Sequence, residues 1–165
     1  METSREQRGQ QWLEELLQYA AISTSVRSEK SPEFWEDSCW LLIDEKPLAP
    51  EQIQALMGAE GDVLDSIQYL ANTILNLGRE SGQQGAFTVD LAGYRLHRYA
   101  ELQAIADCAA SKVRETGNEV ELKALSAAER RQVHTILKEY ADLETQSRGQ
   151  EPDRRLVVSL VKNTV

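Results

Sequence analysis

The chain has 165 residues, of which 41% are hydrophobic and 27% are charged, and its formal net charge is −9. This composition is typical of a soluble globular protein with one ordinary domain or two small ones. No apolar run approaches the roughly 20 residues of a membrane-spanning helix. Residues 1–11 are polar and lack the apolar stretch of a signal peptide, so we expect a cytoplasmic protein.

Charge is distributed unevenly along the chain. Residues 1–92 carry a net charge of −10, whereas residues 93–165 carry +1. Because Lys and Arg neutralise the phosphates of nucleic acids, the second half is the better candidate for a nucleic-acid site.

The sequence offers little for a metal, cofactor or catalytic centre. Cys39 and Cys108 have neither CxxC spacing nor a nearby histidine, so we expect two buried, reduced thiols and no metal site. The two histidines lie outside recognisable catalytic motifs, and no glycine pattern of a nucleotide-binding loop occurs. We therefore expect no enzymatic activity and no cofactor.

The first elements alternate between helix and strand patterns. After a polar lead-in over residues 1–11, apolar residues repeat at helical spacing from Trp12 to Ala20. Residues 22–26 alternate as in a strand, residues 28–37 form a charged loop, and residues 38–44 are typical of a short buried strand. Pro50 suits the first turn of a helix that ends at Met57.

A strongly amphipathic helix follows Gly61. We expect its buried side to be the apolar stripe Val63, Ile67, Leu70, Ile74 and Leu77, widened by Leu64, Ala71 and Leu75. The solvent side would then carry Asp65, Gln68, Asn72 and Asn76. Residues 77–86 contain three glycines and end the helix, and residues 87–91 alternate as in a half-buried strand. Residues 12–92 thus predict the order helix–strand–strand–helix–helix–strand.

The second half begins with a long helix over about residues 94–115. Its predicted buried face is Tyr99, Leu102, Ala106, Ala109 and Val113, whereas His97 and Arg98 are expected at the surface. A strand over residues 119–125 precedes a helix that begins after Ser126, and Ser126 with Glu129 fits a capping box. That helix is expected to bury Val133, Ile136, Leu137 and Tyr140. Residues 143–147 fit a strand, residues 148–153 a turn and residues 156–161 a final strand.

The first candidate site is the loop Gly58, Ala59, Glu60 and Gly61. Glycines at this spacing between two helices let the backbone approach a ligand's phosphates, and amides at the next helix N-terminus can bind them. The stretch 56–76 resembles the type II KH domain of the Jag family (SpoIIIJ-associated, KhpB-like proteins), and the element order of residues 12–92 is the one that this resemblance implies.

KH loops usually carry a basic residue between the glycines. Here Ala59 and Glu60 stand there, and Asp62 and Asp65 follow, which would repel a phosphate. A weak RNA contact and a turn kept only for packing or dimerisation both remain open.

The second candidate site is a basic column on the helix after Ser126. Arg130, His134 and Lys138 share one side of this helix because residues four apart stack, and Arg131 projects nearly opposite the apolar stripe. An arginine can fork onto a phosphate, and an imidazole can donate to another oxygen or stack on a base. An ordinary solvated helix face is the alternative interpretation.

Residues 125–161 are similar to the R-3-H domain, which binds single-stranded nucleic acid and follows the KH domain in the Jag family. The resemblance covers roughly residues 12–162 and is most specific at AERRQVH and EPDRR. It implies that Arg130 and His134 are the name-giving pair, with further positive charge from Arg148, Arg154 and Arg155. For Arg154 and Arg155, charges that flank an apolar strand to limit aggregation are the alternative. The sequence matches no part of the extra N-terminal domain that many Jag proteins carry.

We therefore expect an α+β protein with a polar lead-in (1–11), a KH-like domain (12–92), a connecting helix (93–118) and a small α/β R-3-H-like domain (119–163). The predicted function is non-catalytic binding of single-stranded RNA by a post-transcriptional regulator or RNA chaperone, mainly through the C-terminal domain. Single-stranded DNA is a second candidate ligand. The alternative is a protein-interaction scaffold whose degenerate KH domain pairs with itself or, as the resemblance implies, with a second small KH protein.

Overall fold

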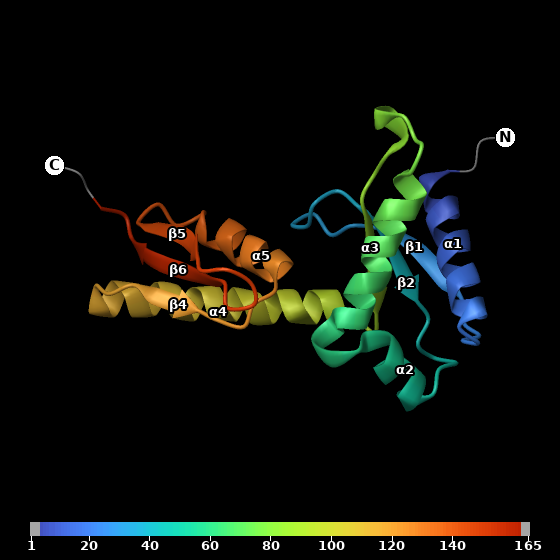
Figure 1. Cartoon of the computed structure of the whole chain (residues 1–165), viewed down its shortest axis with the longest axis horizontal. Helices are drawn as coiled ribbons and strands as arrows, with labels where there is room; N and C mark the ends of the chain where they lie inside the picture. The colour runs from blue at the N-terminus through green and yellow to red at the C-terminus, as the bar shows by residue number, and fades with distance from the viewer. Residues whose placement is uncertain (1–3, 163–165) are drawn as a thin grey trace. The chain divides into compact units, whose positions relative to one another are not determined.

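The computed structural model describes residues 4–162 and has an α+β fold that divides into two compact units, Met1–Arg95 and Leu96–Val165 (Figure 1). The first unit contains α1 (Arg5–Tyr19), β1 (Val26–Lys30), β2 (Cys39–Ile43), α2 (Pro50–Met57), α3 (Asp62–Asn76) and β3 (Phe87–Leu91). The second contains most of α4 (Tyr94–Thr116), then β4 (Val120–Leu122), α5 (Ala127–Leu137), β5 (Leu143–Arg148) and β6 (Arg155–Leu160). No helix in this described part of the chain is long and apolar enough to cross a membrane.

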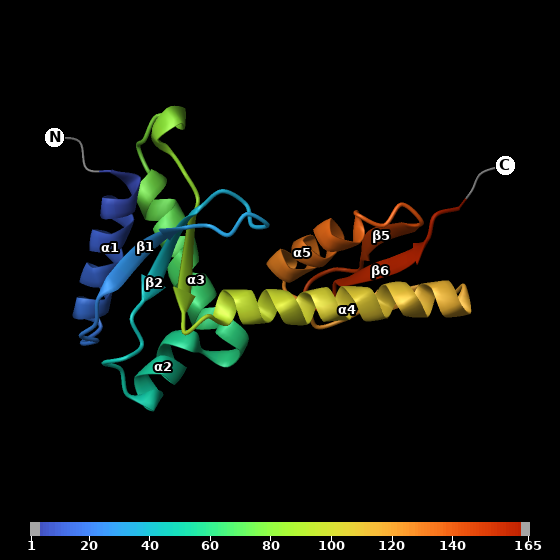
Figure 2. The same ribbon diagram turned by 180° about the vertical axis from the view of Figure 1, so that it is seen from behind.

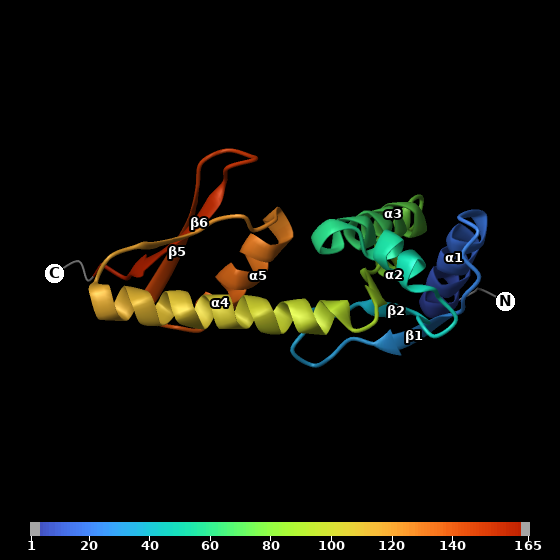
Figure 3. The same cartoon turned by 90° about the horizontal axis from the view of Figure 1, so that it is seen from below.

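The first unit is a three-stranded sheet with its helices on one face, as Figure 3 shows. The strand order is β1-β2-β3, with β1 antiparallel and β3 parallel to the central strand β2. The element order that the sequence predicts for this half is confirmed. Pro50 stands at the start of α2, where its fixed φ and missing amide hydrogen suit the first turn.

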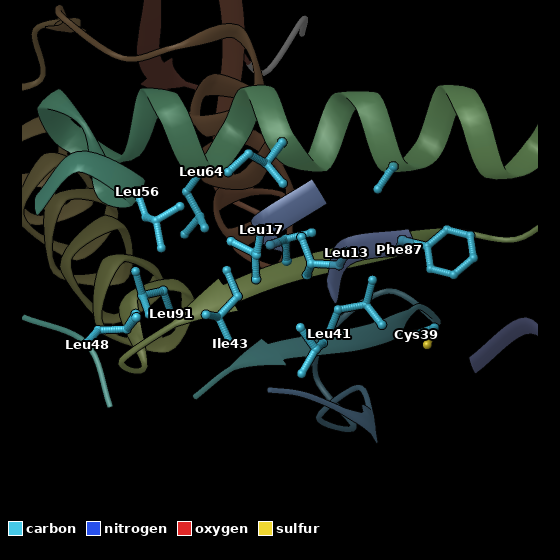
Figure 4. Packing of buried hydrophobic residues seen from close by; sticks show 14 residues of the cluster. Leu13, Leu17, Cys39, Leu41, Ile43, Leu48, Leu56, Leu64, Phe87 and Leu91 are labelled. Atoms are coloured by element: carbon cyan, nitrogen blue, oxygen red, sulfur yellow. The ribbon is translucent and has the colours of Figure 1, made fainter. Parts of the chain in front are cut away.

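The core of the first unit lies between the helices and the sheet (Figure 4). Leu13 and Leu17 of α1 and Leu64 of α3 are almost fully buried against Leu41 and Phe87 of the sheet. Each such side chain contributes about 1.5–3 kcal/mol when it leaves water. These contacts hold α1 and α3 on the sheet.

The two cysteines differ in their environment. Cys39 is buried in the core of the first unit, and this burial, assisted by the charge of Glu6, raises the pKa of its thiol. Cys108 lies exposed on α4, so the expectation that it is buried is wrong. Helical spacing places it beside, rather than within, the apolar face that Ala106 and Ala109 contribute to the core.

The first helix begins earlier than its apolar pattern indicates. Residues 5–11, predicted as a polar lead-in, form the start of α1, and residues 1–3 of that segment lie outside the described residues. Ser4 caps the helix by accepting the Gln7 amide at 3.2 Å, while the Gln7 side chain accepts the Ser4 amide. A polar first turn is therefore stabilised by its cap rather than by burial.

The first strand is shifted along the chain. The alternation over residues 22–26 predicts a strand there, but only Val26 belongs to β1, which continues to Lys30 and pairs with β2. Ala21 has a positive φ of 58° directly after α1, and the following residues reverse the chain. The alternating pattern in this segment reflects partial burial of a loop.

The helix α3 buries a narrower face than its apolar stripe predicts. Leu64, Ile67 and Ala71 are buried, whereas four members of the stripe are exposed, at 37% for Val63, 41% for Leu70, 48% for Ile74 and 79% for Leu77. The reason lies in Gln68, Asn72 and Asn76 of the same helix, which are half-buried and not on the solvent side as predicted, whereas Asp65 is exposed as predicted.

The amide side chains of α3 close the outer edge of β3. Asn72 donates to the Phe87 carbonyl at 2.8 Å and accepts its amide at 2.9 Å, and Gln68 accepts the Val89 amide at 3.0 Å. Asn76 makes the same pair of bonds with Gly85. Unpaired strand-edge groups are costly when buried, so these bonds set the rotation of α3 and turn part of its apolar stripe outward.

The strand β3 is buried on both faces, which corrects the half-buried strand predicted from its alternation. Its two polar side chains have partners: Thr88 shares a 2.9 Å hydrogen bond with Ser38, and Asp90 accepts the backbone amide of Arg95 at 2.9 Å. Polar residues in a strand thus mark hydrogen-bonded positions here, not exposed ones.

The second unit packs two helices on one face of an antiparallel sheet with strand order β4-β6-β5. Figure 2 shows α4 running along the strands β5 and β6. The shared core is formed mainly by Leu102, Ala106, Ala109, Ala110 and Val113 of α4, by Val133, Ile136 and Leu137 of α5, and by Leu143, Leu156 and Val158 of the sheet. The strand β4 is shorter than the predicted strand over residues 119–125 because Ala124 has a positive φ of 59°.

Candidate nucleic-acid interface

The helix α5 is fixed at its first turn by Ser126 and Glu129. Ser126 Oγ accepts the Glu129 amide at 3.2 Å, and the Glu129 carboxylate accepts the Ser126 amide at 2.9 Å, so the predicted capping box is confirmed. Arg98 of α4 donates from Nε to the same carboxylate at 2.7 Å. Glu129 therefore both caps α5 and ties it to α4.

The pKa of Glu129 reflects these contacts. Burial of the side chain would raise the pKa, but the hydrogen bonds from Arg98 and Ser126 outweigh it and hold the pKa below its ordinary value of 4.5. Because folding lowers this pKa, the contact contributes fully above pH 4.5, and its contribution is lost as the pH falls through the lowered value.

Replacement of Glu129 by glutamine tests this link. We expect the free energy of unfolding of the second unit to fall by about 1–2 kcal/mol at pH 7, because the ion pair is only partly exposed and the cap weakens. Below pH 4.5 the difference from the wild-type chain should shrink. Urea unfolding at several pH values measures both effects. Glu139→Gln, which changes an exposed carboxyl shortly after the end of α5, is the control. A pH-independent difference would contradict the assignment.

Arg130 is the most deeply buried charged residue of the candidate site. Its side chain is 7% exposed, and its Nη1 donates to the carbonyls of Leu125 at 2.7 Å and Arg154 at 3.2 Å. Its Nη2 forms an ion pair with Glu151, which is in the turn between β5 and β6. Arg130 thus connects the start of α5 to that turn and leaves little of its guanidinium for a ligand.

An open groove of about 450 Å³ lies between α5, β5 and the turn. It is lined by Ala127, Arg130, Arg131, His134, Thr145, Ser147, Glu151, Arg154 and Leu156. Three arginines against one carboxylate make this groove basic, although the chain as a whole is acidic. We call it the basic groove.

His134 and Arg154 present the accessible donors of the basic groove. His134 is exposed and shares a hydrogen bond through Nδ1 with the hydroxyl of Thr145 on β5. Arg154 is exposed, and no carboxylate among residues 4–162 pairs with its guanidinium. Together with the hydroxyls of Thr145 and Ser147, they form a surface that can donate to phosphate or ribose oxygens.

Arg148 and Arg155 lie outside this surface. They are paired across β5 and β6 on the sheet face opposite Leu156 and Val158, whose side chains enter the core with α5. Arg148 forms a bidentate pair with Glu119 at 2.6 and 2.9 Å, which raises the pKa of its guanidinium. Arg155 approaches Glu121 at 3.1 Å. Of the three arginines that the resemblance adds to the site, only Arg154 lines the basic groove.

The column on α5 is also only partly assembled. Arg130 and His134 of this column line the basic groove, together with Arg131, but Lys138 is the exposed C-cap residue of α5 and is not among the lining residues. The sequence reasoning missed Thr145, Ser147 and Glu151. Thr145 and Ser147 lie on the same sheet face as Val158 and Leu156 and alternate along β5 with residues of the opposite face. The two-residue periodicity of a strand was therefore the signal that could have identified them.

The other candidate loop lies in the first unit. Gly58 follows α2, Ala59 to Gly61 form a single 3₁₀ turn, and α3 begins at Asp62. Ala59, Glu60 and Asp62 are exposed, and Gly61 is buried. This loop therefore presents carboxylates where the basic groove presents arginines. Nowhere in the described residues do three or more His, Cys, Asp or Glu side chains gather in a way that could hold a metal ion.

Comparison with known proteins agrees with the geometry of the second unit. The model of the R-3-H domain matches residues 100–160, which span the basic groove and the core beneath it. RNA-binding protein KhpB of Clostridium symbiosum is 33% identical over 113 residues, 68% of this chain and 50% of that protein. RNA-binding protein KhpB of Bacillus subtilis is 33% identical over 111 residues, 66% of this chain and 52% of that protein. The chain belongs to a Jag/KhpB-like family.

The family assignment confirms the resemblance recognised at AERRQVH and EPDRR, and the R-3-H model includes both motifs. A third Jag/KhpB-like relative, RNA-binding protein KhpB of Lactiplantibacillus plantarum, is 30% identical over 107 residues, 65% of this chain and 33% of that protein. The chain spans about half the length of the first two relatives.

Proposed function

We propose that this chain is a non-catalytic, cytoplasmic protein that binds single-stranded RNA mainly through the basic groove of its second unit. The observation that carries the proposal is the placement of Arg154 and His134 beside two hydroxyls in a groove with three arginines, within the matched R-3-H domain. Three relatives bear the name RNA-binding protein, which supports RNA as the ligand. Post-transcriptional regulation or RNA chaperoning is the role we propose for this binding.

Single-stranded rather than duplex RNA fits this groove. Arg154, His134 and Arg131 are few cations for a duplex, whose recognition relies on many phosphate contacts along two strands. An imidazole and a guanidinium plane can stack on an unpaired base, and the hydroxyls can bond to the 2′-OH. Single-stranded DNA lacks that hydroxyl and should bind more weakly.

A titration of the full chain with a labelled 12-nucleotide single-stranded RNA, the matching duplex and the matching single-stranded DNA tests the proposal. We expect the single-stranded RNA to bind best, with a salt slope of about −1.5 to −2, as for two or three neutralised phosphates. Tighter binding of the duplex, or no binding of any of the three, would contradict it.

The exposed stripe of α3 supports a second role as a dimerisation surface. Val63, Ile67, Leu70, Ile74 and Leu77 follow an alternating four- and three-residue spacing, as in a helix-pairing seam, and all but Ile67 are more than a third exposed. We propose that this stripe pairs with a second copy or with a small KH protein.

A single residue of the stripe suffices to test this pairing. Leu70→Asp should convert a dimer into a monomer in sedimentation velocity, because a carboxylate in a paired apolar seam is strongly disfavoured. Gln54→Asp, an exposed position on α2, is the matched control. A wild-type chain that stays monomeric both alone and with a small KH protein would contradict this role.

A further inference from the structure

The glycines of the loop at residues 58–61 make room for the chain's own side chains. Gly58 and Gly61 have positive φ values of 70° and 82°, which only glycine adopts without strain. A Cβ on Gly58 would lie 2.0 Å from Oδ1 of Asp62, and a Cβ on Gly61 would lie 2.5 Å from the ring of Tyr94. The space beside each glycine, which would let a ligand approach the backbone, is therefore already filled.

Asp62 occupies the position of an anion at the start of α3. Its Oδ1 accepts the Val63 amide at 2.8 Å, one of the N-terminal amides that a helix offers to a phosphate. The carboxylate thus satisfies the donor and supplies negative charge at the helix dipole from within the chain. A phosphate would have to displace it.

The residues after β3 hold the loop from the other side. Tyr94 donates its hydroxyl hydrogen to the Glu60 carbonyl at 2.5 Å. Arg95, the basic residue next to it, is engaged by the Asp65 carboxylate and donates from Nε to the Val89 carbonyl at 3.0 Å. The loop is fixed in its closed form, and its neighbouring cation is already neutralised.

The charge of the residues at and after this loop also disfavours binding of a phosphate. Glu60, Asp62 and Asp65 are exposed, and the segment 56–76 contains neither lysine nor arginine. Arg95 balances the charge of Asp65, but Glu60 and Asp62 remain, and over a Debye length of about 8 Å at physiological salt these two carboxylates repel a phosphodiester.

We propose that this loop is closed to nucleic-acid phosphates, and that Asp62 and Tyr94 are specificity-determining residues which confine RNA to the basic groove. The inference rests on the proposed function for the identity of the ligand, but its structural basis lies entirely in the first unit. It separates this chain from KH loops that clamp a nucleic-acid backbone.

The test opens the loop and compares it with an equal change of charge elsewhere. Glu60→Lys with Asp62→Ala empties the space beside Gly58 and adds three positive charge units. Glu15→Lys with Glu33→Ala makes the same charge change on α1 and in the β1–β2 loop. We expect the opened chain to bind a 12-nucleotide single-stranded RNA about tenfold more tightly, and the control to change by less than about threefold.

A second measurement requires no variant. Photo-crosslinking of the wild-type chain to the same RNA should mark the basic groove and leave residues 58–62 unmarked, whereas the opened chain should gain crosslinks there. Wild-type crosslinks at residues 58–62, or equal affinities of the opened and control chains, would overturn the inference. A wild-type chain without any RNA binding would refute the proposed function, and the gain of binding by the opened chain would still decide the state of the loop.

Discussion

Replacement of Arg130 by alanine is expected to lower the free energy of unfolding of the second unit by about 3 kcal/mol. The guanidinium is almost fully buried and holds two backbone carbonyls, those of Leu125 and Arg154, as well as the Glu151 carboxylate. Truncation would leave the carbonyls without a donor and would release the turn between β5 and β6. Urea unfolding followed by the NMR signals of Val133 and Val158 measures the effect in this unit.

Arg154→Ala is the matched control for this prediction, since it removes an arginine of the same groove that is exposed and has no ion pair among the described residues. We expect it to change the stability by less than about 0.5 kcal/mol. A stable Arg130→Ala chain that had lost only RNA affinity would show that Arg130 is a ligand-binding residue and not a structural one. Arg130 would then contact RNA directly, as its place in the R-3-H motif implies.

The combination of His134→Ala and Arg154→Glu is expected to weaken binding of single-stranded RNA at least tenfold, or about 1.4 kcal/mol. These two residues carry the accessible donors of the basic groove: the ring of His134 shares one hydrogen bond, with Thr145, and Arg154 is exposed and has no ion pair among residues 4–162. Charge reversal at Arg154 also places a carboxylate near Glu151, which would repel a phosphate. Fluorescence anisotropy with a labelled 12-nucleotide RNA measures the change.

His97→Ala with Lys112→Glu is the control, because it makes the same change of charge at exposed positions of α4 outside the groove. It should weaken binding by less than about threefold, through the overall charge alone. Equal losses in the two double variants would mean that net charge, and not the groove, determines affinity.

The elements of the fold were readable from the sequence wherever a local signal determined them. The capping box at Ser126 and Glu129, Pro50 at the start of α2 and the buried strand β2 all follow from residues close together in the chain. The rotation of α3 did not. Its apolar stripe competes with Asn72 and Asn76, which must pair with the edge around β3, and their partners there lie 15 and 9 residues further along the chain.

The sequence predicts which residues of the candidate site share a helix face, but not what contacts each of them makes. Four-residue spacing places Arg130 and His134 on one side of a helix, yet it says nothing about what covers that side. The turn carrying Glu151 reaches Arg130 from 21 residues away, so the guanidinium that is predicted to contact a ligand holds α5 to this turn. By contrast, the outward direction of Arg155 follows from strand parity, since its neighbour Leu156 is a core residue.

The most direct test of the account is an NMR titration of the isotope-labelled full chain with single-stranded RNA. We predict that the largest amide shifts occur at Arg131, His134, Thr145, Ser147 and Arg154, with little change at residues 58–62. Shifts concentrated in the first unit, with the basic groove unaffected, would contradict it.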